Sequence, residues 1–479
     1  MDSKKKGKVI EQYDNIKIIR LEDSNVPIYE VEEYKFTESE RKLLNNHSKI
    51  FTEIELDTVR KEPDISLRRQ VIHAYLKMKI PETKNKEALI SAIINQVIGY
   101  GPLSHFINDK NLEEIMVNGV NTPVFVFHRR YGMCKTRLKF HEKDEILKII
   151  NRLCWIHNKP IKPIIDLSTI DGSRANITMD PLTIRGPTLT IRKQKRHFFT
   201  ITELIDLGTL SMDLAALLWF AADGMRLLPA NIIICGSIGA GKTSLLNALA
   251  MLTPPEERII TIEETPELRL EGKDNWIPLT SSDDYSMADL VKDSLRMRPN
   301  RIIVGEIRGA EAMSLFNSMN VGHKGMGTMH SSSAREAIYR LQGEPMNVPL
   351  REVSNLDLIV VQNIFNIGGI PQRRITEVAT IGGHEGETIL LGNVYEWDPE
   401  NDKSTQSALS SSTFLDKFAE KAHIKKKKVV DELNRRRVVL RTLLDNDIFS
   451  HDDLSKAIST FYREEGNLDA VVGEVGKKS

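Results

Sequence analysis

Residues 231–243 read Asn-Ile-Ile-Ile-Cys-Gly-Ser-Ile-Gly-Ala-Gly-Lys-Thr. The apolar run at the start predicts a strand, and the residues from Thr243 onward predict a helix. Between them lies the pattern G-x-x-x-x-G-K-[ST], in the strand–loop–helix context that a phosphate-binding loop requires. The glycines allow backbone N–H groups to surround a phosphate, and the helix N-terminus adds partial positive charge. Lys242 would then reach the β- and γ-phosphates of a nucleotide, and the Thr243 hydroxyl would coordinate Mg²⁺.

The length and charge of the chain narrow the classes of protein that fit it. Its 479 residues exceed the roughly 250–300 residues at which single cores stop growing, so we expect more than one domain. Lysine plus arginine and aspartate plus glutamate number 66 each, so the formal net charge is zero. This balance gives no overall field toward nucleic acid or a membrane surface. The basic segments at 425–428 and 435–441 are interpreted as a solvated, charged end.

Cysteine usage and hydropathy indicate a cytoplasmic protein. Cys134, Cys154 and Cys235 are isolated in sequence, which gives no disulfide framework and no C-x-x-C pair for zinc. No apolar stretch reaches the ~20 residues of a membrane-spanning helix, and the N-terminus does not resemble a signal peptide. Any action at a membrane is therefore expected to be peripheral.

Changes of pattern along the chain predict five parts. Helical patterns dominate up to a break at Gly99-Tyr-Gly-Pro, and short β-rich runs follow from Leu112. Thr200-Ile-Thr-Glu carries a capping box that starts the next helices. Apolar runs alternate with helical segments up to about Trp397, which predicts a mostly parallel sheet covered by helices. The predicted parts are a variable N-terminal extension (1–60), an N-terminal α+β domain (61–195), a linker (196–199), an α/β domain (200–398) and a helical C-terminal tail (399–479).

A second strand leads into an acidic residue in Arg301-Ile-Ile-Val-Gly-Glu. In a nucleotide site, such a carboxylate emerges at the carboxyl edge of the sheet, beside Mg²⁺. Aspartate is more usual there, so Glu306 would have to orient Mg²⁺-bound water, activate the attacking water, or do both. The alternative interpretation is a surface glutamate after a core strand.

A third strand, in Arg258-Ile-Ile-Thr-Ile-Glu-Glu-Thr-Pro-Glu, ends in the clustered acids Glu263, Glu264 and Glu267. Clustered carboxylates repel one another unless a cation or a role in proton transfer accounts for them. They indicate Mg²⁺ positioning and polarisation of the attacking water. Taken alone, the segment is equally consistent with an ordinary acidic turn.

A fourth segment, Gly322-His-Lys-Gly-Met-Gly-Thr-Met-His, holds two histidines. His323 and His330 have no third plausible ligand nearby, so we do not expect a metal site. A histidine close to a γ-phosphate can donate a hydrogen bond and report the state of the nucleotide. A structural role for these histidines is the alternative.

Taken in order, segments 236–243, 263–267, 304–311 and 322–330 resemble four motifs of the type II/type IV secretion ATPase superfamily. These motifs are its phosphate loop, its Asp box, its Glu-bearing second nucleotide motif and its His box. Four segments upstream are also similar to the family: Tyr100-Gly-Pro-Leu, Glu114-Ile-Met-Val-Asn-Gly, Asp171-Gly-Ser-Arg and Thr190-Ile-Arg-Lys. The resemblance covers the chain from about residue 86 onward. It implies an α/β fold with a RecA-like P-loop ATPase domain, a smaller N-terminal α+β domain and a helical C-terminal tail.

Further segments are similar to the archaeal branch of this superfamily, which holds archaellum motor ATPases and archaeal type IV pilus assembly ATPases. They are His128-Arg-Arg-Tyr-Gly, Pro345-Met-Asn-Val-Pro, Arg373-Arg-Ile-Thr-Glu-Val, Tyr395-Glu-Trp-Asp-Pro and the tail run 430–440. The tetracysteine zinc element of the bacterial pilus-extension and type II secretion ATPases is absent, and Glu264 stands where many relatives have aspartate. Residues 1–60 match no motif of the family, and we hypothesise that they dock a partner.

The resemblance implies a role for each site residue. ATP with Mg²⁺ would be bound by Gly236, Ser237, Gly239, Ala240, Gly241, Lys242, Thr243, Ser244 and Thr328, with Thr243, Glu263 and Glu306 near the metal. Glu306 resembles the catalytic glutamate, His330 belongs with Thr328 to the phosphate-sensing box, and Glu263, Glu264 and Glu267 form the acidic box. Family members form six-subunit rings in which arginines reach a nucleotide held between two domains. Arg174 and Arg192 lie in the matching segments, and Arg298 is a further candidate.

The resemblance also implies a function. We expect a cytoplasmic ATPase that forms a homohexameric ring, peripheral at the inner face of the cell membrane. Hydrolysis would drive assembly or rotation of a pilin-like filament, or related secretion, through a polytopic membrane partner. Archaellum rotation and pilus assembly are not separated, although Pro345-Met-Asn-Val-Pro and the tail slightly favour the archaellum.

Two other classes of function stay open. One is a nucleic-acid-translocating ring, against which the zero net charge argues. The other is a nucleotide-gated scaffold with little turnover, against which the intact Lys242, Thr243 and Glu306 argue. We therefore expect no nucleic-acid partner.

Overall fold

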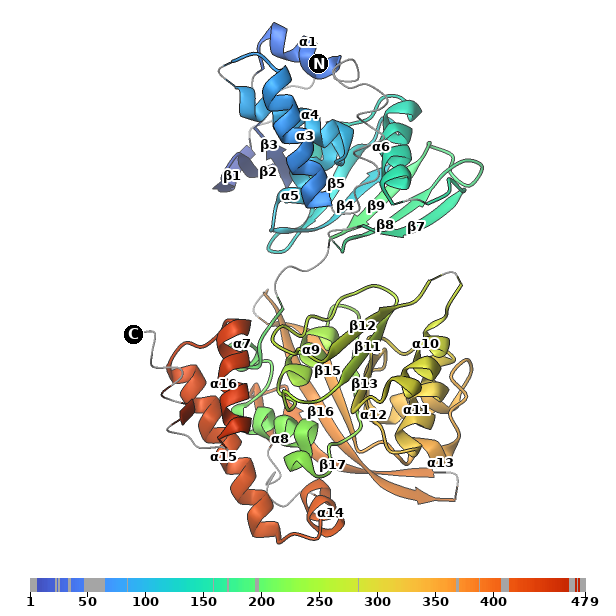
Figure 1. Cartoon of the computed structure of the whole chain (residues 1–479), viewed down its shortest axis with the longest axis vertical. Coiled ribbons are helices and arrows are strands. Elements are labelled where there is room, and N and C mark those ends of the chain that lie inside the picture. Colours follow the sequence, from blue (N-terminus) through green and yellow to red (C-terminus); the bar gives the residue numbers. More distant parts are fainter. Residues whose placement is uncertain are drawn as a thin grey trace. The chain divides into compact units, whose positions relative to one another are not determined.

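The computed structural model describes residues 7–21, 24, 26–32, 36–46, 65–83, 85–157, 159–169, 172–193, 198–282, 284–367, 370–386, 388–405, 413–464, 470–471 and 473. The chain forms two compact units, Met1–Arg196 and His197–Ser479, which are hereafter the N-terminal unit and the C-terminal unit (Figure 1). The predicted linker, 196–199, falls at this division. Its residues 196 and 197, and Asp171 of the predicted turn at 171–173, lie outside the described residues.

The N-terminal unit is built on one nine-stranded sheet in the order β1-β2-β3-β6-β5-β4-β9-β8-β7. Neighbouring strands are antiparallel, except for the parallel pair β3–β6. Buried and more exposed residues alternate along β5, as expected of a strand with one face on the core. The strands are β1 (Gly7–Tyr13), β2 (Ile16–Leu21), β3 (Ile28–Val31), β4 (Leu112–Asn118), β5 (Pro123–His128), β6 (Gly132–Lys139), β7 (Ile164–Ser168), β8 (Arg174–Thr178) and β9 (Thr188–Arg192).

Helices of the N-terminal unit form two packing groups. Ile146, Ile149 and Ile150 of α6 lie in one hydrophobic cluster with the strand residues Val124 and Val126. Helices α3 and α4 bury a second cluster between them, which also includes Ile156 at the end of α6. The helices are α1 (Glu38–Asn45), α3 (Ile65–Lys79), α4 (Lys86–Val97), a short 3-10 turn (Gly101–Leu103), α5 (Ser104–Asn108) and α6 (Lys143–Ile156).

One carboxylate helps to fix strands β1–β3 to the rest of this unit, in addition to the pairing of β3 with β6. The hydroxyls of Tyr13 and Tyr29 both donate to Asp109 Oδ2, at 2.7 and 2.6 Å. The other oxygen, Oδ1, accepts the backbone N–H of Asn111 at 2.9 Å. Because Tyr29 is almost fully buried and β3 pairs with β6, strands β1–β3, which lie within the predicted variable extension, are part of the sheet of the N-terminal unit.

The C-terminal unit is built on a second nine-stranded sheet in the order β12-β11-β13-β14-β10-β15-β16-β17-β18. The strands from β12 to β15 are parallel, and the pairs β15–β16, β16–β17 and β17–β18 are antiparallel. The strands are β10 (Ile232–Cys235), β11 (Ile259–Glu263), β12 (Trp276–Thr280), β13 (Arg301–Val304), β14 (Lys324–Met329), β15 (Leu358–Ile367), β16 (Ile370–Glu385), β17 (Thr388–Asp398) and β18 (Lys403–Thr405).

Helices cover both faces of this parallel sheet, so its strands are apolar on both sides. Along β10, Ile232 and Ile234 face one cluster while Ile233 and Cys235 face the other. Helices α10–α13 lie on one side, and α7, α8 and the C-terminal helices lie on the opposite side (Figure 1). The helices are α7 (Ile201–Asp206), α8 (Met212–Asp223), the 3-10 turn Gly224–Arg226, α9 (Lys242–Met251), α10 (Met287–Ser294), the 3-10 turn Leu295–Met297, α11 (Glu311–Asn320), α12 (Ala334–Gln342), α13 (Leu350–Val353), α14 (Thr413–Lys421), α15 (Lys426–Asp445) and α16 (His451–Arg463).

The C-terminal helices pack into the core of this unit. Arg436 on α15 donates to the buried carboxylate of Asp223 at 2.5 Å, and the Tyr462 hydroxyl on α16 donates to the same oxygen at 2.9 Å. Trp219 donates to the Tyr462 hydroxyl. Residues 413–463, predicted as part of a helical tail, therefore share one hydrophobic cluster with α7–α9. No helix among the described residues is long and apolar enough to cross a bilayer.

The fold class predicted from the sequence is confirmed. The C-terminal unit is α/β with a RecA-like order of parallel strands, an α+β unit precedes it, and helices follow it. The capping box at Thr200 and Glu203 forms at the start of α7. The antiparallel strands β16–β18 were not predicted, because a mostly parallel sheet was inferred from alternating apolar and helical segments alone.

Candidate nucleotide site

The loop between β10 and α9 has the backbone of a phosphate cradle. Gly241 has φ +96° and stands at the N-cap of α9, a left-handed conformation that side chains disfavour. A Cβ at Gly236 would lie only 1.9 Å from the carbonyl oxygen of Gln362 on β15. Both glycines are therefore required by local geometry. The backbone N–H groups at the start of α9 are free of helical partners and available to an anion.

Lys242 closes this loop on itself. Its Nζ donates to the carbonyl oxygens of Gly236 and Ser237, both at 3.0 Å, and lies 3.2 Å from Nδ1 of His330. Burial lowers the pKa of Lys242, although the nearby Glu306 charge acts in the opposite direction. The ammonium thus lies inside the loop, where a phosphate could exchange for the two carbonyls.

Glu306 follows directly after β13 and lies among positively charged and polar groups. Arg308 Nη2 donates to Glu306 Oε2 at 2.6 Å, and Arg308 Nη1 lies 3.4 Å from Glu264 Oε2. Burial would raise the pKa of Glu306, but the Arg308 hydrogen bond and the charges of Arg308, His330 and Lys242 lower it overall. Glu306 is therefore ionised at neutral pH, and Arg308 holds it in place.

His330 connects the phosphate loop with Glu306. Its Nε2 lies 3.0 Å from Glu306 Oε1 at an angle that makes no hydrogen bond, so Oε1 has no hydrogen-bond partner within the described part of the chain. Burial and the Lys242 charge lower the pKa of His330, which favours the neutral ring. Because Lys242 Nζ can only donate, Nδ1 must accept, and the ring proton is placed on Nε2 toward Glu306.

The three acids of the 263–267 segment lie in different environments. The Glu263 carboxylate accepts the backbone N–H groups of Glu267 and Leu268 at 3.0 and 3.1 Å. Burial raises the pKa of Glu263 to about 7, against these hydrogen bonds, which lower it. Glu263 also packs against Gly305, the residue before Glu306. Glu264 and Glu267 are exposed, so the structure shows Glu263 shaping the segment and Glu264 reaching Arg308.

Thr328 and Thr243 differ in what their hydroxyls contact. The Thr328 hydroxyl is buried and donates to the carbonyl of Gly305 at 2.6 Å, which fixes the backbone just before Glu306. Thr243 and Ser244 are half-exposed in the first turn of α9. Ser237 and Gly239 are exposed in the loop, whereas Ala240 is buried.

The residues present fit a Mg²⁺ ion that arrives with its nucleotide. Within the described ranges, no three His, Cys, Asp or Glu side chains gather as a self-sufficient metal cage. Mg²⁺ usually keeps several waters and takes only one or two protein oxygens plus the phosphates. The Thr243 hydroxyl and the unpartnered Oε1 of Glu306 supply oxygens of that kind.

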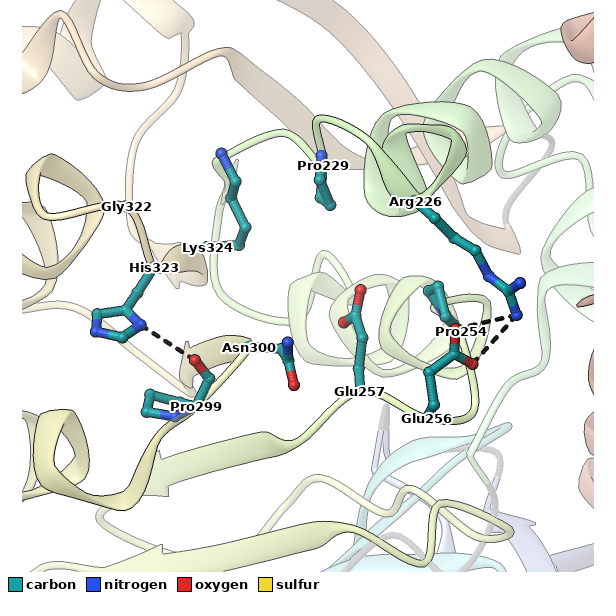
Figure 2. Close-up of a pocket in the computed structure, with 10 residues that line it drawn as sticks. All are labelled: Arg226, Pro229, Pro254, Glu256, Glu257, Pro299, Asn300, Gly322, His323 and Lys324. Atoms are coloured by element: carbon teal, nitrogen blue, oxygen red, sulfur yellow. Dashed lines mark hydrogen bonds and ion pairs between the residues drawn. The ribbon is translucent and has the colours of Figure 1, made fainter.

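The two histidines of the 322–330 segment lie at opposite ends of β14. His330 follows the carboxyl end, whereas His323 precedes the amino end and its Nδ1 donates to the Pro299 carbonyl at 3.1 Å (Figure 2). His323 helps to line a hollow of about 330 Å³ together with Pro229, Pro254, Glu257, Asn300 and Lys324. These residues lie before the strands or, for Lys324, at the first position of β14, so the hollow and the phosphate loop occupy opposite edges of the sheet.

The two arginines predicted to assist catalysis lie on the N-terminal unit. Arg174 at the start of β8 pairs in register with Arg192 at the end of β9, so the structure brings the two together. On its other side Arg192 pairs with Glu114 of β4. Arg298 lies instead on the C-terminal unit, after α10, with φ +55°.

Sequence reasoning missed three residues that contact the site. Arg308 holds Glu306, and its only signal was its position two residues further along the same segment. Arg373 on β16 donates through Nε to the carbonyl of Gly239 at 2.9 Å. Gln362 on β15 lies against Gly236 and Gly241. The last two come from strands more than 100 residues away in sequence, and although Arg373 opens one of the quoted archaeal-branch segments, its sequence position does not indicate a contact with the loop.

The chain is similar to known proteins over the residues that build this site. Residues 98–377 match the profile of the family described as "Type II/IV secretion system protein". The chain is 44% identical over 264 residues to uncharacterized protein MJ0781 of Methanocaldococcus jannaschii, covering 53% of this chain and 36% of that protein. It thus spans about a third of the length of that relative.

Two further relatives are covered more fully. Uncharacterized protein MJ0900 of the same organism is 32% identical over 404 residues, which are 81% of this chain and 72% of the relative. Type IV secretion system protein PtlH of Bordetella pertussis is 33% identical over 250 residues, 47% of this chain and 74% of PtlH. By its family profile and by these relatives, the chain belongs to the type II/IV secretion system protein family.

Proposed function

We propose that this protein is a Mg²⁺-dependent ATP hydrolase that powers a secretion machine or a pilin-like filament. The single observation that supports hydrolysis best is the contact chain from Lys242 through His330 to Glu306. It joins the residue that would hold the β- and γ-phosphates to the carboxylate that would act on water. A loop that merely bound a nucleotide would need Lys242 but no ionised glutamate at the next strand end.

Each residue has its own role in the proposed hydrolysis. Lys242 leaves the Gly236 and Ser237 carbonyls and binds the phosphates, while Thr243 and Glu306 would hold Mg²⁺, which supplies charge neutralisation between the phosphates. Glu306 orients a water molecule, whose oxygen attacks the γ-phosphorus. The bond to the β–γ bridging oxygen breaks and the electron pair leaves with ADP, while the water proton passes to Glu306 or to the phosphate. His330, neutral and protonated on Nε2, lies between Lys242 and Glu306.

The setting of this activity is proposed from the family. PtlH is named as a type IV secretion system protein, and the archaeal-branch segments favour a filament motor, an archaellum or an archaeal type IV pilus. We infer a homohexameric ring in the cytoplasm, docked peripherally on a polytopic membrane partner. Arg174 and Arg192 are proposed to act on the nucleotide in that ring.

The test is steady-state ATP hydrolysis with Mg²⁺ by the full chain and by Glu306→Gln. We expect turnover to fall about 10²- to 10⁴-fold in the variant, the usual contribution of a positioned base, with ATP binding retained. Glu256→Gln is the matched control, because Glu256 pairs with Arg226 on the opposite edge of the sheet. Archaeal-type lipid in one arm tests membrane docking.

Two results would contradict the proposal. Equal turnover by wild type and Glu306→Gln would assign hydrolysis to another group. Tight ATP binding by wild type without turnover, with and without lipid, would favour a nucleotide-gated scaffold.

A further inference from the structure

The hairpin of β15 and β16 borders the phosphate loop. Cys235, the last residue of β10, pairs with Val361 of β15. Residues 362–367 of β15 therefore continue past the carboxyl end of β10, paired with residues 370–375 of β16. A bulge between Val361 and Gln362 shifts the register at this point, and bulges commonly redirect side chains beside functional sites.

Gln362 contacts both ends of the glycine-rich loop. Its backbone oxygen lies 1.9 Å from the place where a Cβ on Gly236 would stand, and its side-chain Nε2 lies 3.1 Å from the corresponding place on Gly241. Arg373, on the other strand of the hairpin, donates to the carbonyl of Gly239, which lies between Gly236 and Gly241 in the loop. The loop therefore rests on this hairpin along its whole length.

The side-chain amide of Gln362 is fully buried and unpaired. Neither Oε1 nor Nε2 has a hydrogen-bond partner within the described ranges. Buried side-chain amides are nearly always bonded, because leaving one unpaired destabilises the fold. Such an amide beneath a ligand loop needs an explanation, and a partner that appears in another conformation of that loop would supply one.

That other conformation follows from the partners of Lys242. Its ammonium donates hydrogen bonds to the carbonyl oxygens of Gly236 and Ser237. These carbonyls lose that donor once Lys242 turns to a phosphate. We propose that Gln362 is a positioning residue whose amide then hydrogen-bonds the loop backbone, so that it stabilises the nucleotide-filled loop at the expense of the empty one. The inference rests on the proposed function, since it requires that a nucleotide fills the loop.

The experiment replaces Gln362 by methionine, which has a similar shape but no amide. Affinity of the full chain for ATP and ADP with Mg²⁺ is measured by titration, and the melting temperature is measured without nucleotide. We expect the Kd of Gln362→Met to rise about three- to tenfold, the worth of one neutral hydrogen bond. The melting temperature of the empty protein should stay the same or rise, because an unpaired buried amide is removed. A merely structural residue would not move the two quantities in opposite directions.

Two further variants complete the test. Gln342→Met makes the same replacement at the last residue of α12 and should change neither quantity. Gln362→Asn keeps the amide on a side chain that is one methylene shorter, and it should also weaken nucleotide binding. This variant provides the test if Gln362→Met does not fold. Unchanged affinity in the Gln362 variants, or lost affinity accompanied by a lower melting temperature of the empty protein, would overturn the inference alone. A wild-type chain that binds no ATP would overturn the proposed function and the inference with it.

Discussion

The two edges of the parallel sheet in the C-terminal unit use charged side chains in opposite ways. At the amino edge, Arg301 is fully buried and makes two hydrogen bonds to Glu257 and one to the Ala222 carbonyl. At the carboxyl edge, Lys242 is buried and lies beside His330, while the side chains of His330 and Glu306 remain partly exposed. The same four strands, β10, β11, β13 and β14, carry both edges.

The difference shows that charge content alone does not mark a site. Charges at the amino edge are mostly matched within the fold and mainly stabilise it. Among the described residues, Nη1 of Arg301 has no hydrogen-bond partner, whereas its other nitrogens donate to Glu257 and to the Ala222 carbonyl. Charged groups at the carboxyl edge contact carbonyls and side chains, and a nucleotide can replace these contacts. The comparison predicts that substitutions at the amino edge change stability, whereas substitutions of Lys242, His330 and Glu306 at the carboxyl edge change binding or turnover.

The largest effect on stability is expected from Arg301→Ala. It would leave the Glu257 carboxylate, only 11% exposed, without its partner, and breaking a buried pair from one side costs about 3–5 kcal/mol. Urea unfolding measures the loss, and ATP affinity of the folded fraction should be unchanged. Weakened ATP binding without a change in unfolding free energy would erase the distinction between the edges.

A pH-dependent effect is expected from Glu263→Gln at the carboxyl edge. The folded pKa of Glu263, about 7, lies above its ordinary 4.5, so ionising Glu263 costs more in the folded chain. Its contribution to the free energy of unfolding therefore falls by about 3 kcal/mol as pH rises from about 4.5 to 7, and stays low above that. Unfolding of wild type and variant at pH 5 and pH 8 gives the difference, in which other carboxylates cancel. If the free energy of unfolding depended on pH in the same way for the two proteins, the pKa of Glu263 would not be raised in the folded chain.

The smallest effect is expected from Arg226→Ala at the rim of the amino-edge hollow. Its pair with Glu256 is 3.0 Å long, but both side chains are about half exposed, and such pairs contribute about 0–1 kcal/mol. Urea unfolding should therefore barely change, in contrast to Arg301→Ala on the same edge. A loss as large as that of Arg301→Ala would mean that burial is not what separates the two pairs.

Local sequence predicted the parts of the site that one chain segment builds. The strand–loop–helix around Lys242 and the strand ending at Glu306 follow from apolar runs and fixed spacings. Spacing could not assign the histidines, since His323 and His330 are separated by β14 and only strand direction sends them to different edges. Gln362 and Arg373 reach the loop through sheet order, which no spacing of residues encodes.

The attachment of β1–β3 through Asp109 has a practical consequence for anyone who shortens this chain. The family profile starts at residue 98, which invites a truncation that discards the residues before it. Such a fragment would lack Tyr13 and Tyr29, strip the Asp109 carboxylate of both hydroxyl donors and uncover the edge of β6. An exposed strand edge can pair with strands of other chains, so we expect the truncated protein to aggregate more readily than the full chain.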